Sequence, residues 1–328
     1  MSTEGTTRSA NPTVREVVIT GVGLATAGLT SADDLLGPVP AEGGFDPATG
    51  LKGRDMRNKD RASRLALRAA EPALRDAGLL DEKAQFTGEG DTTAVVVSSN
   101  LGSLDTVCEF TDTIARSSVM GLSPLGLPQT SSNVIAGWVA IRYALRGPNL
   151  TVCNGATSGL DALYWARNLI VAGRAKAAVV VGVEPSGEAV TKLFGEQSTD
   201  VAVAVILESR AAAAARGARV RARVAGYARA ASLRQAADAA CRSVAQPVGL
   251  WLGGDRDAQP FDEGAGVQVP RLDLEDRLGP LSGALGVLQC AAGVAHLDRS
   301  GSGTVLATAG GTDHDAAAAL LLAQTTHS

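Results

Sequence analysis

Apolar runs along the chain alternate with longer segments in which apolar residues recur at helical spacing. In residues 59–78, for example, Leu65, Ala69, Ala73 and Leu74 fall on one helical face, and a glycine ends the pattern. Short continuous apolar runs are typical of buried strands. The predicted strands are 14–20, 92–97, 149–153, 177–183, 201–207, 220–226, 248–252 and 304–308; the predicted helices are 59–78, 104–115, 133–145, 158–172, 233–244 and 283–297; residues 316–323 fit either a strand or a helix.

The alternation occurs in two successive halves, which predicts a layered α/β architecture. We place the first half at residues 14–212 and the second at 213–328, after a polar lead at 1–13 that we expect to be disordered. Segments 203–208 and 220–226 are expected to form a hairpin-like pair where the halves join.

Composition limits how the core is built and which partners suit the surface. Of 328 residues, 45% are hydrophobic but only 3% are aromatic, and 38 are glycine, so we expect a core of Ala, Val and Leu with close backbone approaches. The 30 basic and 34 acidic residues give a net charge of −4. This slightly acidic balance argues against nucleic acid or an anionic membrane as the main partner.

The cysteines and histidines lie too far apart for a metal site, and we expect no cofactor. The first residues lack the apolar run of a signal peptide, and no uncharged stretch approaches the length of a membrane span. We therefore expect a soluble, cytoplasmic protein. The cysteines are Cys108, Cys153, Cys241 and Cys290, and the histidines are His296, His314 and His327.

A glycine turn near the start resembles part of a dinucleotide-binding fingerprint. Gly21 and Gly23 follow the first predicted strand, but Thr26 occupies the third glycine position. No acidic residue follows a second strand at the expected distance. The sequence therefore does not favour a nucleotide-binding site here.

The segment RGPNLTVCNGATSGLDA (146–162) resembles the nucleophile region of β-ketoacyl synthases, which have the thiolase fold. Further matches to that family follow in order along nearly the whole chain. They are VVITGVG (17–23), KDRASRLALRAAEPALRDAGL (59–79), SPLGLPQTSSNVIAGWVAIRYALRGP (123–148), LGPLSGALGVLQCAAGVAHL (278–297) and ATAGGTDHDAAAALL (307–321). The resemblance implies a thiolase-like, five-layered αβαβα fold with two related halves.

The residues that perform condensation in that family are missing. The nucleophilic cysteine falls on Ala156, the histidine of the Gly-His-Thr motif on Pro280, and the lysine before it on Glu275. The second histidine should follow the strand at 248–252, where GGDRD (253–257) contains none. Alanine cannot carry an acyl thioester, and a proline side chain cannot donate a hydrogen bond. We therefore expect no catalytic residue in this chain.

This pattern resembles the chain-length factor, or KSβ subunit, of type II polyketide synthases. That resemblance implies a noncatalytic subunit that forms a heterodimer with a catalytic ketosynthase (KSα) and meets the acyl carrier protein mainly through it. KSβ proteins usually have Gln where this chain has Ala156, which suggests a divergent branch such as a polyene-forming system. The implied dimer interface is the strand with Asn149, Leu150, Thr151, Val152 and Cys153.

The resemblance also implies that residues in and before SPLGLP line an acyl tunnel that sets chain length. Gly126 stands where ketosynthases usually have a bulky Phe, so we expect it to leave room for a chain. An apolar, narrow wall would suit a reduced or polyene chain better than a poly-β-ketone. The expected lining residues are Leu101, Phe110, Thr113, Ile114, Leu125, Gly126 and Leu127.

Two other functions stay open. One is a stand-alone, ketosynthase-like homodimer that binds an acyl chain without KSα. The other is a thioester hydrolase with a relocated nucleophile at Cys153 or Ser158. Against the second, Cys153 lies on a predicted buried strand, and Ser158 lacks the Gly-x-Ser-x-Gly context of a nucleophile elbow. The charged segment 53–64 is expected to be a solvated helix start, with carrier-protein contact as an alternative.

Overall fold

The computed structural model describes residues 16–40, 43–194, 199–242, 244–253, 269–311 and 314–325. Strands and helices alternate along these residues, as the apolar pattern predicts. The strands are β1 (Val17–Leu24), β2 (Thr93–Ser98), β3 (Asn149–Val152), β4 (Ala177–Glu184), β5 (Val201–Ser209), β6 (Ala222–Ala230), β7 (Val248–Gly253), β8 (Arg271–Asp273), β9 (Thr304–Gly310) and β10 (Ala317–Ala323). The α-helices are α1 (Pro47–Gly50), α2 (Arg61–Asp76), α3 (Leu104–Ser117), α4 (Val134–Tyr143), α5 (Ser158–Val171), α6 (Glu188–Phe194), α7 (Arg210–Ala215), α8 (Leu233–Cys241), α9 (Glu275–Leu278) and α10 (Leu285–Ser300).

The described strands are hydrogen-bonded in the order β3-β2-β4-β5-β1-β6-β10-β9-β7-β8. The first five strands and the last five repeat one topology. In each set the first strand runs antiparallel to the fifth, the fifth antiparallel to the fourth, and the fourth, second and third parallel to one another. The fold therefore consists of two related halves, joined where β1 pairs with β6.

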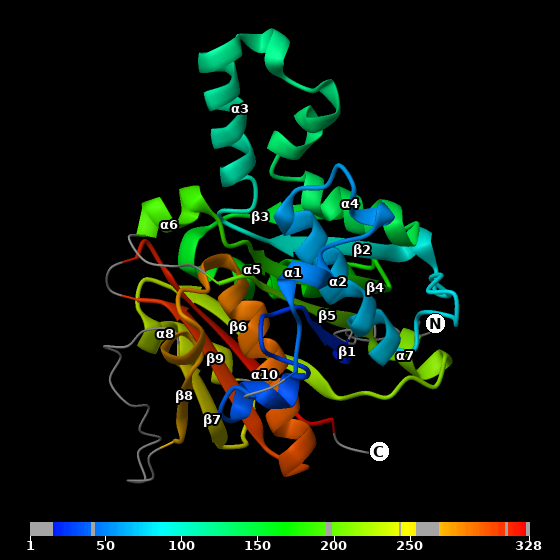
Figure 1. The fold of residues 1–328 in the computed structure, drawn as a ribbon. Helices are drawn as coiled ribbons and strands as arrows, with labels where there is room; N and C mark the ends of the chain where they lie inside the picture. The colour runs from blue at the N-terminus through cyan, green and yellow to red at the C-terminus, as the bar shows by residue number, and fades with distance from the viewer. Residues whose placement is uncertain are drawn as a thin grey trace, which may run out of the picture.

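Helices separate and cover these two halves in layers (Figure 1). Helices α5 and α10 lie between the halves and contact strands of both, while α2 and α4 cover the outer face of the first half and α8 that of the second. This is the five-layered αβαβα, thiolase-like arrangement expected from the sequence. The boundary between residues 212 and 213 stays a prediction.

Small residues allow the central helices to approach closely. A Cβ on Gly159 of α5 would lie 2.6 Å from the backbone nitrogen of Gly286 on α10, so a side chain at either position would push the helices apart. The same reason applies to Gly21 and Gly23, which lie inside β1 rather than in a phosphate-binding turn. A Cβ on each would lie 2.3 Å from backbone atoms of Ala73 on α2. Close backbone packing thus explains the glycines that resembled a nucleotide-binding motif.

One predicted pairing was wrong. Strands β5 and β6 do not form a hairpin-like pair, because β1 lies between them and pairs with both. The strand at the N-terminus is buried on both faces, so it belongs in the centre of the sheet and separates strands that are neighbours in sequence. Within the described residues, no helix is both long and apolar enough to cross a membrane.

Residues 101–133 project from the body of the fold, and we call this segment the arm (Figure 1). The arm begins with α3, and the chain returns to the body through two 3₁₀ helices, η4 (Val119–Gly121) and η5 (Pro124–Thr130). None of the residues of α3 is buried. A 14-residue helix without a single buried residue has little tertiary packing to stabilise it in isolation.

Candidate functional site

Ala156, the position that the motif resemblance assigns to the nucleophile, lies at the carboxyl ends of β2, β3 and β4. Ala156 is in the 3₁₀ turn η6 (Gly155–Thr157), which leads directly into the N-terminus of α5. Gly155 has φ of +71°, a left-handed conformation that favours glycine. The turn therefore keeps the shape that presents a side chain at a helix N-terminus, but Ala156 presents only a methyl group.

The other two assigned positions, Glu275 and Pro280, lie in the segment that leads to a second turn. Glu275 begins α9, and its carboxylate accepts a hydrogen bond of 2.9 Å from the N–H of Leu281. Pro280 follows α9 and precedes the 3₁₀ turn η7 (Ser282–Ala284), which contacts η6. The segment 254–257, where the second histidine was sought, lies outside the described residues.

The described histidines do not replace the missing ones. His296 lies near the C-terminal end of α10, where burial and nearby Arg299 hold its pKa below the usual value. His314 is exposed after β9, and its backbone N–H bonds to the carbonyl of Gly311. His327 lies outside the described residues, within which no group of His, Cys, Asp and Glu could hold a metal ion.

A buried carboxylate, Glu184 at the end of β4, organises the loops around the site. Its Oε1 accepts hydrogen bonds from the N–H groups of Asn100 at 2.7 Å and Gly283 at 2.9 Å. Its Oε2 accepts from the N–H of Leu101 at 3.1 Å and from the Ser99 hydroxyl at 3.2 Å. The carboxylate thus joins the segment after β2 to the turn η7.

The side chain of Asn100 extends this network to the nucleophile turn. Its Nδ2 donates to the carbonyl of Gly155 and to Ser282 Oγ, both at 2.9 Å. Its Oδ1 accepts from Ser158 Oγ at 2.9 Å, and Ser158 Oγ in turn accepts from the N–H of Asn154 at 2.6 Å. The loops at the ends of β2 and β3 and both turns are therefore held by one continuous set of hydrogen bonds.

A second buried carboxylate, Asp161 on the first turn of α5, holds the nucleophile turn by hydrogen bonds. Its oxygens accept from Thr157 Oγ1 and Asn154 Nδ2, both at 2.9 Å, and from the hydroxyl of Tyr227 on β6. Burial and this bond raise the pKa of Tyr227, so it stays a neutral donor. Tyr227 stacks on Tyr164 with ring centroids 4.0 Å apart, which links the site to the second half of the fold.

Neither alternative nucleophile is activated. Cys153 is an exposed residue that follows β3, but its sulfur is partly buried. This partial burial and the charge of Glu184 raise the pKa of the thiol. Ser158 is fully buried, and its hydroxyl is already bonded to Asn100 and Asn154 rather than to a base. A thioester hydrolase would need a thiolate or a base-paired hydroxyl, and neither residue supplies one.

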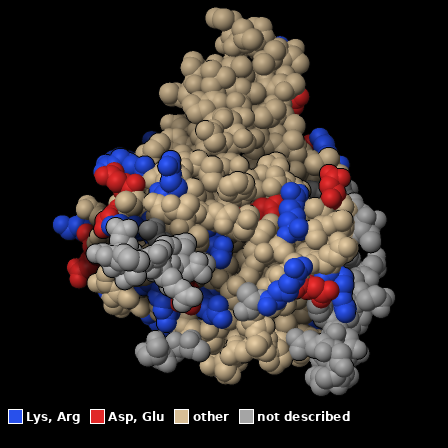
Figure 2. All heavy atoms as spheres, turned by 180° about the vertical axis from the view of Figure 1, so that it is seen from behind, with Lys and Arg blue, Asp and Glu red and all other residues tan. Residues whose placement is uncertain are grey.

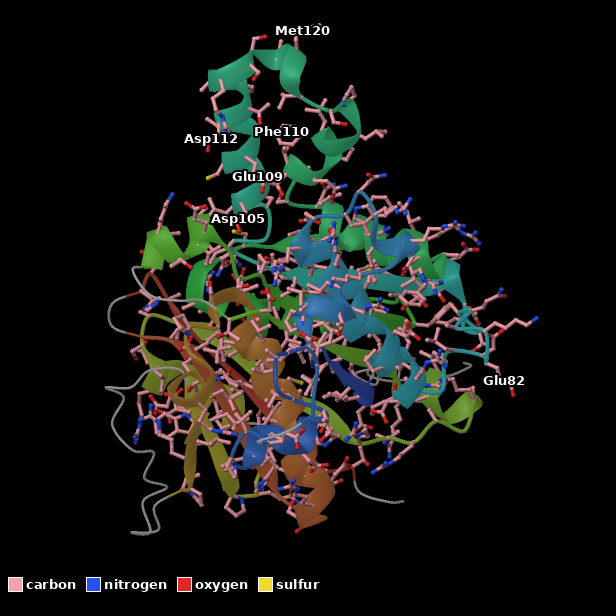
Figure 3. The ribbon with its side chains drawn as sticks, viewed as in Figure 1. Glu82, Asp105, Glu109, Phe110, Asp112 and Met120 are labelled. Atoms are coloured by element: carbon pink, nitrogen blue, oxygen red, sulfur yellow. The ribbon has the colours of Figure 1, made fainter. Side chains whose placement is uncertain are left out.

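The structure brings only some of the expected tunnel residues together. Phe110, Leu125 and Gly126 line a cavity of about 260 Å³ between the arm and the N-terminus of α2. Figure 3 shows Phe110 between α3 and the returning segment of the arm, with Met120 at the tip. The other expected residues do not line this cavity: Leu101 lies at the root of the arm, Thr113 is half-buried beside Gly121, and Ile114 and Leu127 are exposed.

One expectation about this cavity needs correction. Gly126 does not leave room, because the ring of Phe110 occupies the space beside it, 2.8 Å from where a Cβ would stand. The wall combines seven polar or charged residues with Phe110, Leu125 and Gly126. The lining consists of Asn58, Lys59, Asp60, Thr106, Glu109, Phe110, Ser123, Leu125, Gly126 and Gln129.

Strand β3 forms one edge of the described sheet, because only β2 pairs with it. The carbonyl of Val152 accepts from the N–H of Ser99, so the backbone groups of Val152 face β2. The backbone groups of its neighbours Thr151 and Cys153 therefore point out from the sheet, since successive residues of a strand alternate in direction. An edge of this kind is a template for pairing with another chain.

Apolar side chains continue from this edge over the neighbouring helices and the arm. Helices α4 and α5 contact β3 and expose Ile141 and Trp165. On the face in Figure 2, the arm and the surface directly beneath it carry few charged side chains. The arm exposes Val107, Ile114, Val119, Met120, Leu125 and Leu127.

The titration of Glu184 gives the site a measurable pH dependence. Burial raises its pKa to about 7 from the ordinary 4.5, against the opposing effect of its four hydrogen bonds. The titratable group that faces it is the Cys153 thiol, and within the described residues no cation pairs with it. The native state thus holds a proton on Glu184 at pH values where the unfolded chain has lost it.

We expect the free energy of unfolding to fall as the pH rises from about 4.5 to about 7. The stabilising contribution of the proton on Glu184 is complete below the unfolded pKa and is lost through the native pKa, at up to about 1.4 kcal/mol per pH unit. Denaturant unfolding between these pH values measures the slope. The Glu184→Gln variant cannot titrate at this position, so its free energy of unfolding should lack the part of the pH dependence that Glu184 causes. An identical slope in the variant would contradict the assignment.

The sequence reasoning missed the carboxylates and amide that hold the site. The signal for Glu184 was available, since a glutamate ends the otherwise apolar run AAVVVGVE of β4. An acidic residue at the end of a buried strand needs donors in the folded state. No pattern in the sequence indicated that those donors come from segments about 84 and 99 residues away.

Comparisons with known proteins agree with the sequence motifs and the fold. Residues 25–202, more than half of the chain, match the family described as β-ketoacyl synthase, N-terminal domain. The 3-oxoacyl-[acyl-carrier-protein] synthase 2 of Rhizobium meliloti (strain 1021) is 29% identical over 214 residues, which are 57% of this chain and 50% of that enzyme. The match therefore spans only half the length of this relative.

Two solved structures have the same fold over nearly the whole chain. The ishigamide ketosynthase/chain length factor is 23% identical with a TM-score of 0.72, and the comparison covers 94% of this chain and 99% of that one. A type II polyketide synthase ketosynthase in complex with its acyl carrier protein is 15% identical with a TM-score of 0.76, covering 95% and 99%. By its family match and its thiolase-like fold, this chain belongs to the β-ketoacyl synthase family.

Proposed function

We propose that this chain is a noncatalytic chain-length factor, or KSβ subunit, which pairs with a catalytic KSα in type II polyketide biosynthesis in the cytoplasm. The observation that carries the proposal is the fully hydrogen-bonded shell that surrounds an alanine at the nucleophile position. Asn100, Glu184 and Asp161 hold the shape of a ketosynthase site, while Ala156 leaves it without a nucleophile. A site kept in shape without its chemistry fits a structural role in an assembly.

In this proposal the chemistry belongs to KSα. The KSα cysteine carries the acyl chain as a thioester, and malonyl-carrier protein loses CO₂ to give an enolate. The enolate carbon attacks the thioester carbonyl, the thiolate of KSα leaves, and the chain grows by two carbons on the carrier protein. The present chain contributes a wall of the acyl tunnel and sets its length.

The interface in this proposal consists of the β3 edge and the arm. Outward-facing backbone groups of Thr151 and Cys153 would pair with a strand of KSα, and the exposed side chains of the arm would be covered by it. Obligate interfaces of this kind are large, above about 2,000 Å² in total. The similarity in fold to the ishigamide ketosynthase/chain length factor supports this choice of partner.

Co-expression with a KSα that has the intact Cys-His-His set tests the assembly. We expect native mass analysis of the purified complex to give one copy of each chain. A stable homodimer of this chain that excludes KSα would favour the alternative acyl-binding protein. A stable monomer that ignores KSα would contradict both.

The cavity beside Phe110 gives a prediction about chain length. Phe110→Ala removes the ring that fills the space beside Gly126, so we expect the co-expressed pair to make products longer by about one or two two-carbon units, since a phenyl ring fills roughly the volume of several methylenes. Thr113→Trp on the same helix face should shorten them. Product profiling by mass spectrometry measures both effects.

The matched control is Val39→Ala, an exposed apolar residue outside the arm and the β3 edge, which should leave the product unchanged. Unchanged chain length in both Phe110→Ala and Thr113→Trp, with the heterodimer intact, would place the length-determining surface elsewhere.

A further inference from the structure

The buried carboxylate of Glu184 has no chemical role in a site without a nucleophile, yet both of its oxygens accept hydrogen bonds. Four donors converge on its two oxygens, at distances between 2.7 and 3.2 Å. Burying a carboxylate without a cation is unfavourable unless hydrogen bonds compensate for the lost water. The arrangement therefore indicates a structural task for a side chain with two acceptor oxygens.

The donors identify that task. Three of them, Ser99, Asn100 and Leu101, form the root from which the arm leaves the body, directly before α3. The fourth, Gly283, belongs to η7 beside the nucleophile turn. Gly283 must lack a side chain for this contact, since a Cβ there would lie 2.7 Å from Glu184 Oε1 and 3.0 Å from the nitrogen of Asn100.

Besides Glu184, the side chain of Asn100 ties the outgoing root to the turns through its bonds to Gly155, Ser158 and Ser282. Asp105 at the start of α3 accepts a 2.8 Å bond from the N–H of Ala189 on α6 (Figure 3). At the returning end of the arm, Gln129 donates to the carbonyl of Asn58 at 2.7 Å. Between these two ends α3 has no buried residue, so the direction of the arm depends on how its roots are fixed.

We infer that Glu184 is a positioning residue that fixes the root of the arm to the turns around the former nucleophile position, so that the arm meets its partner in one orientation. The inference rests on the proposed role of the arm at the KSα interface. It also explains why a site without a nucleophile keeps its hydrogen-bond network, because that network fixes the orientation of the arm relative to the body of the fold. The raised pKa of Glu184 agrees with this tight enclosure.

Hydrogen exchange on the purified full chain tests the inference without KSα. Glu184→Gln replaces one acceptor oxygen with an NH₂ group that faces donors. We expect amides in peptides covering 99–107 and 281–286 to exchange about three- to tenfold faster than in the unmodified chain, the range for losing one or two buried hydrogen bonds. Peptides from β9 and β10 should be unchanged.

Glu208→Gln is the matched control. Glu208 is equally buried but lies on β5, where it accepts bonds from Thr20 and Arg216. This variant should lower the melting temperature without accelerating exchange at 99–107. Equal exchange rates at 99–107 in folded Glu184→Gln and the unmodified chain, or equal acceleration in the control, would overturn the inference.

A second variant covers the case in which Glu184→Gln does not fold. Ser99→Ala removes a single hydroxyl donor from the carboxylate and should accelerate exchange at 99–107 about two- to fivefold, or the inference fails. The affinity for KSα is then measured separately, and we expect Glu184→Gln to weaken it at least tenfold. If exchange responds but the unmodified chain does not bind KSα, the proposed function fails while the positioning role stands.

Discussion

Incubation of the purified chain with acyl- and malonyl-carrier protein is expected to leave the chain unacylated and to yield no condensation product. Ala156 offers no atom that can form a thioester, and Pro280 offers no donor for the enolate. Losing a nucleophile together with its acid–base partner lowers turnover by about 10⁴-fold or more in well-studied hydrolases. Intact-mass measurement detects an adduct directly, and a stoichiometric acyl group on this chain would contradict the account.

Ala156→Cys separates a missing nucleophile from a misshapen site. The new thiol would stand at the N-terminus of α5, where the helix dipole favours the thiolate. Because the hydrogen bonds of Gly155 and Asn154 keep the turn in shape, we expect this variant to accept an acyl group from a reactive thioester. It should still not condense that group with malonyl-carrier protein. Condensation by this single variant would show that the partner supplies nothing essential.

Thr151→Pro is expected to abolish assembly with KSα, weakening the complex by at least about 100-fold. The N–H of Thr151 points out from the β3 edge, and proline removes that donor while its ring obstructs the neighbouring strand. A 100-fold loss of affinity corresponds to about 3 kcal/mol. The loss of two or more ladder hydrogen bonds together with a steric clash should cost more than that. Native mass analysis or sedimentation of the co-expressed pair measures the effect.

Two further variants make this prediction specific. Thr151→Val keeps the backbone donor and removes only a hydroxyl that has no partner among the residues that the structure describes, so it should assemble normally. Val152→Pro would break the ladder to β2 and lower the stability of the chain itself. Normal heterodimer formation by a folded Thr151→Pro protein would place the interface elsewhere.

Much of the fold follows from local patterns. The apolar face of 59–78 predicted α2, and the helix begins where Asp60 accepts a bond from the N–H of Ser63. The all-apolar run of β10 carries no such periodicity, so its choice between strand and helix depended on pairing with β6 and β9. The insertion of β1 between β5 and β6 is likewise a long-range pairing that no local pattern encodes.

The candidate site likewise has features that residue type alone predicts and features that depend on long-range contacts. That Ala156 carries no nucleophile is a property of its residue type, so the motif resemblance predicts the missing nucleophile without the fold. The contact between Phe110 and Gly126 depends on how the arm folds back on itself, and the sequence predicted open space where the ring lies. The partners of Glu184 come from distant segments, and only the assembled fold brings them together.

Reconstitution from separately purified chains tests the central claim most directly. A KSα with its Cys-His-His set, this chain and an equimolar mixture are each supplied with acyl- and malonyl-carrier protein, and both product and acyl-enzyme are measured by mass spectrometry. The account predicts elongated product from the mixture alone, with every acyl adduct on KSα. Full elongation by KSα without this chain, or an acyl adduct on this chain, would contradict it.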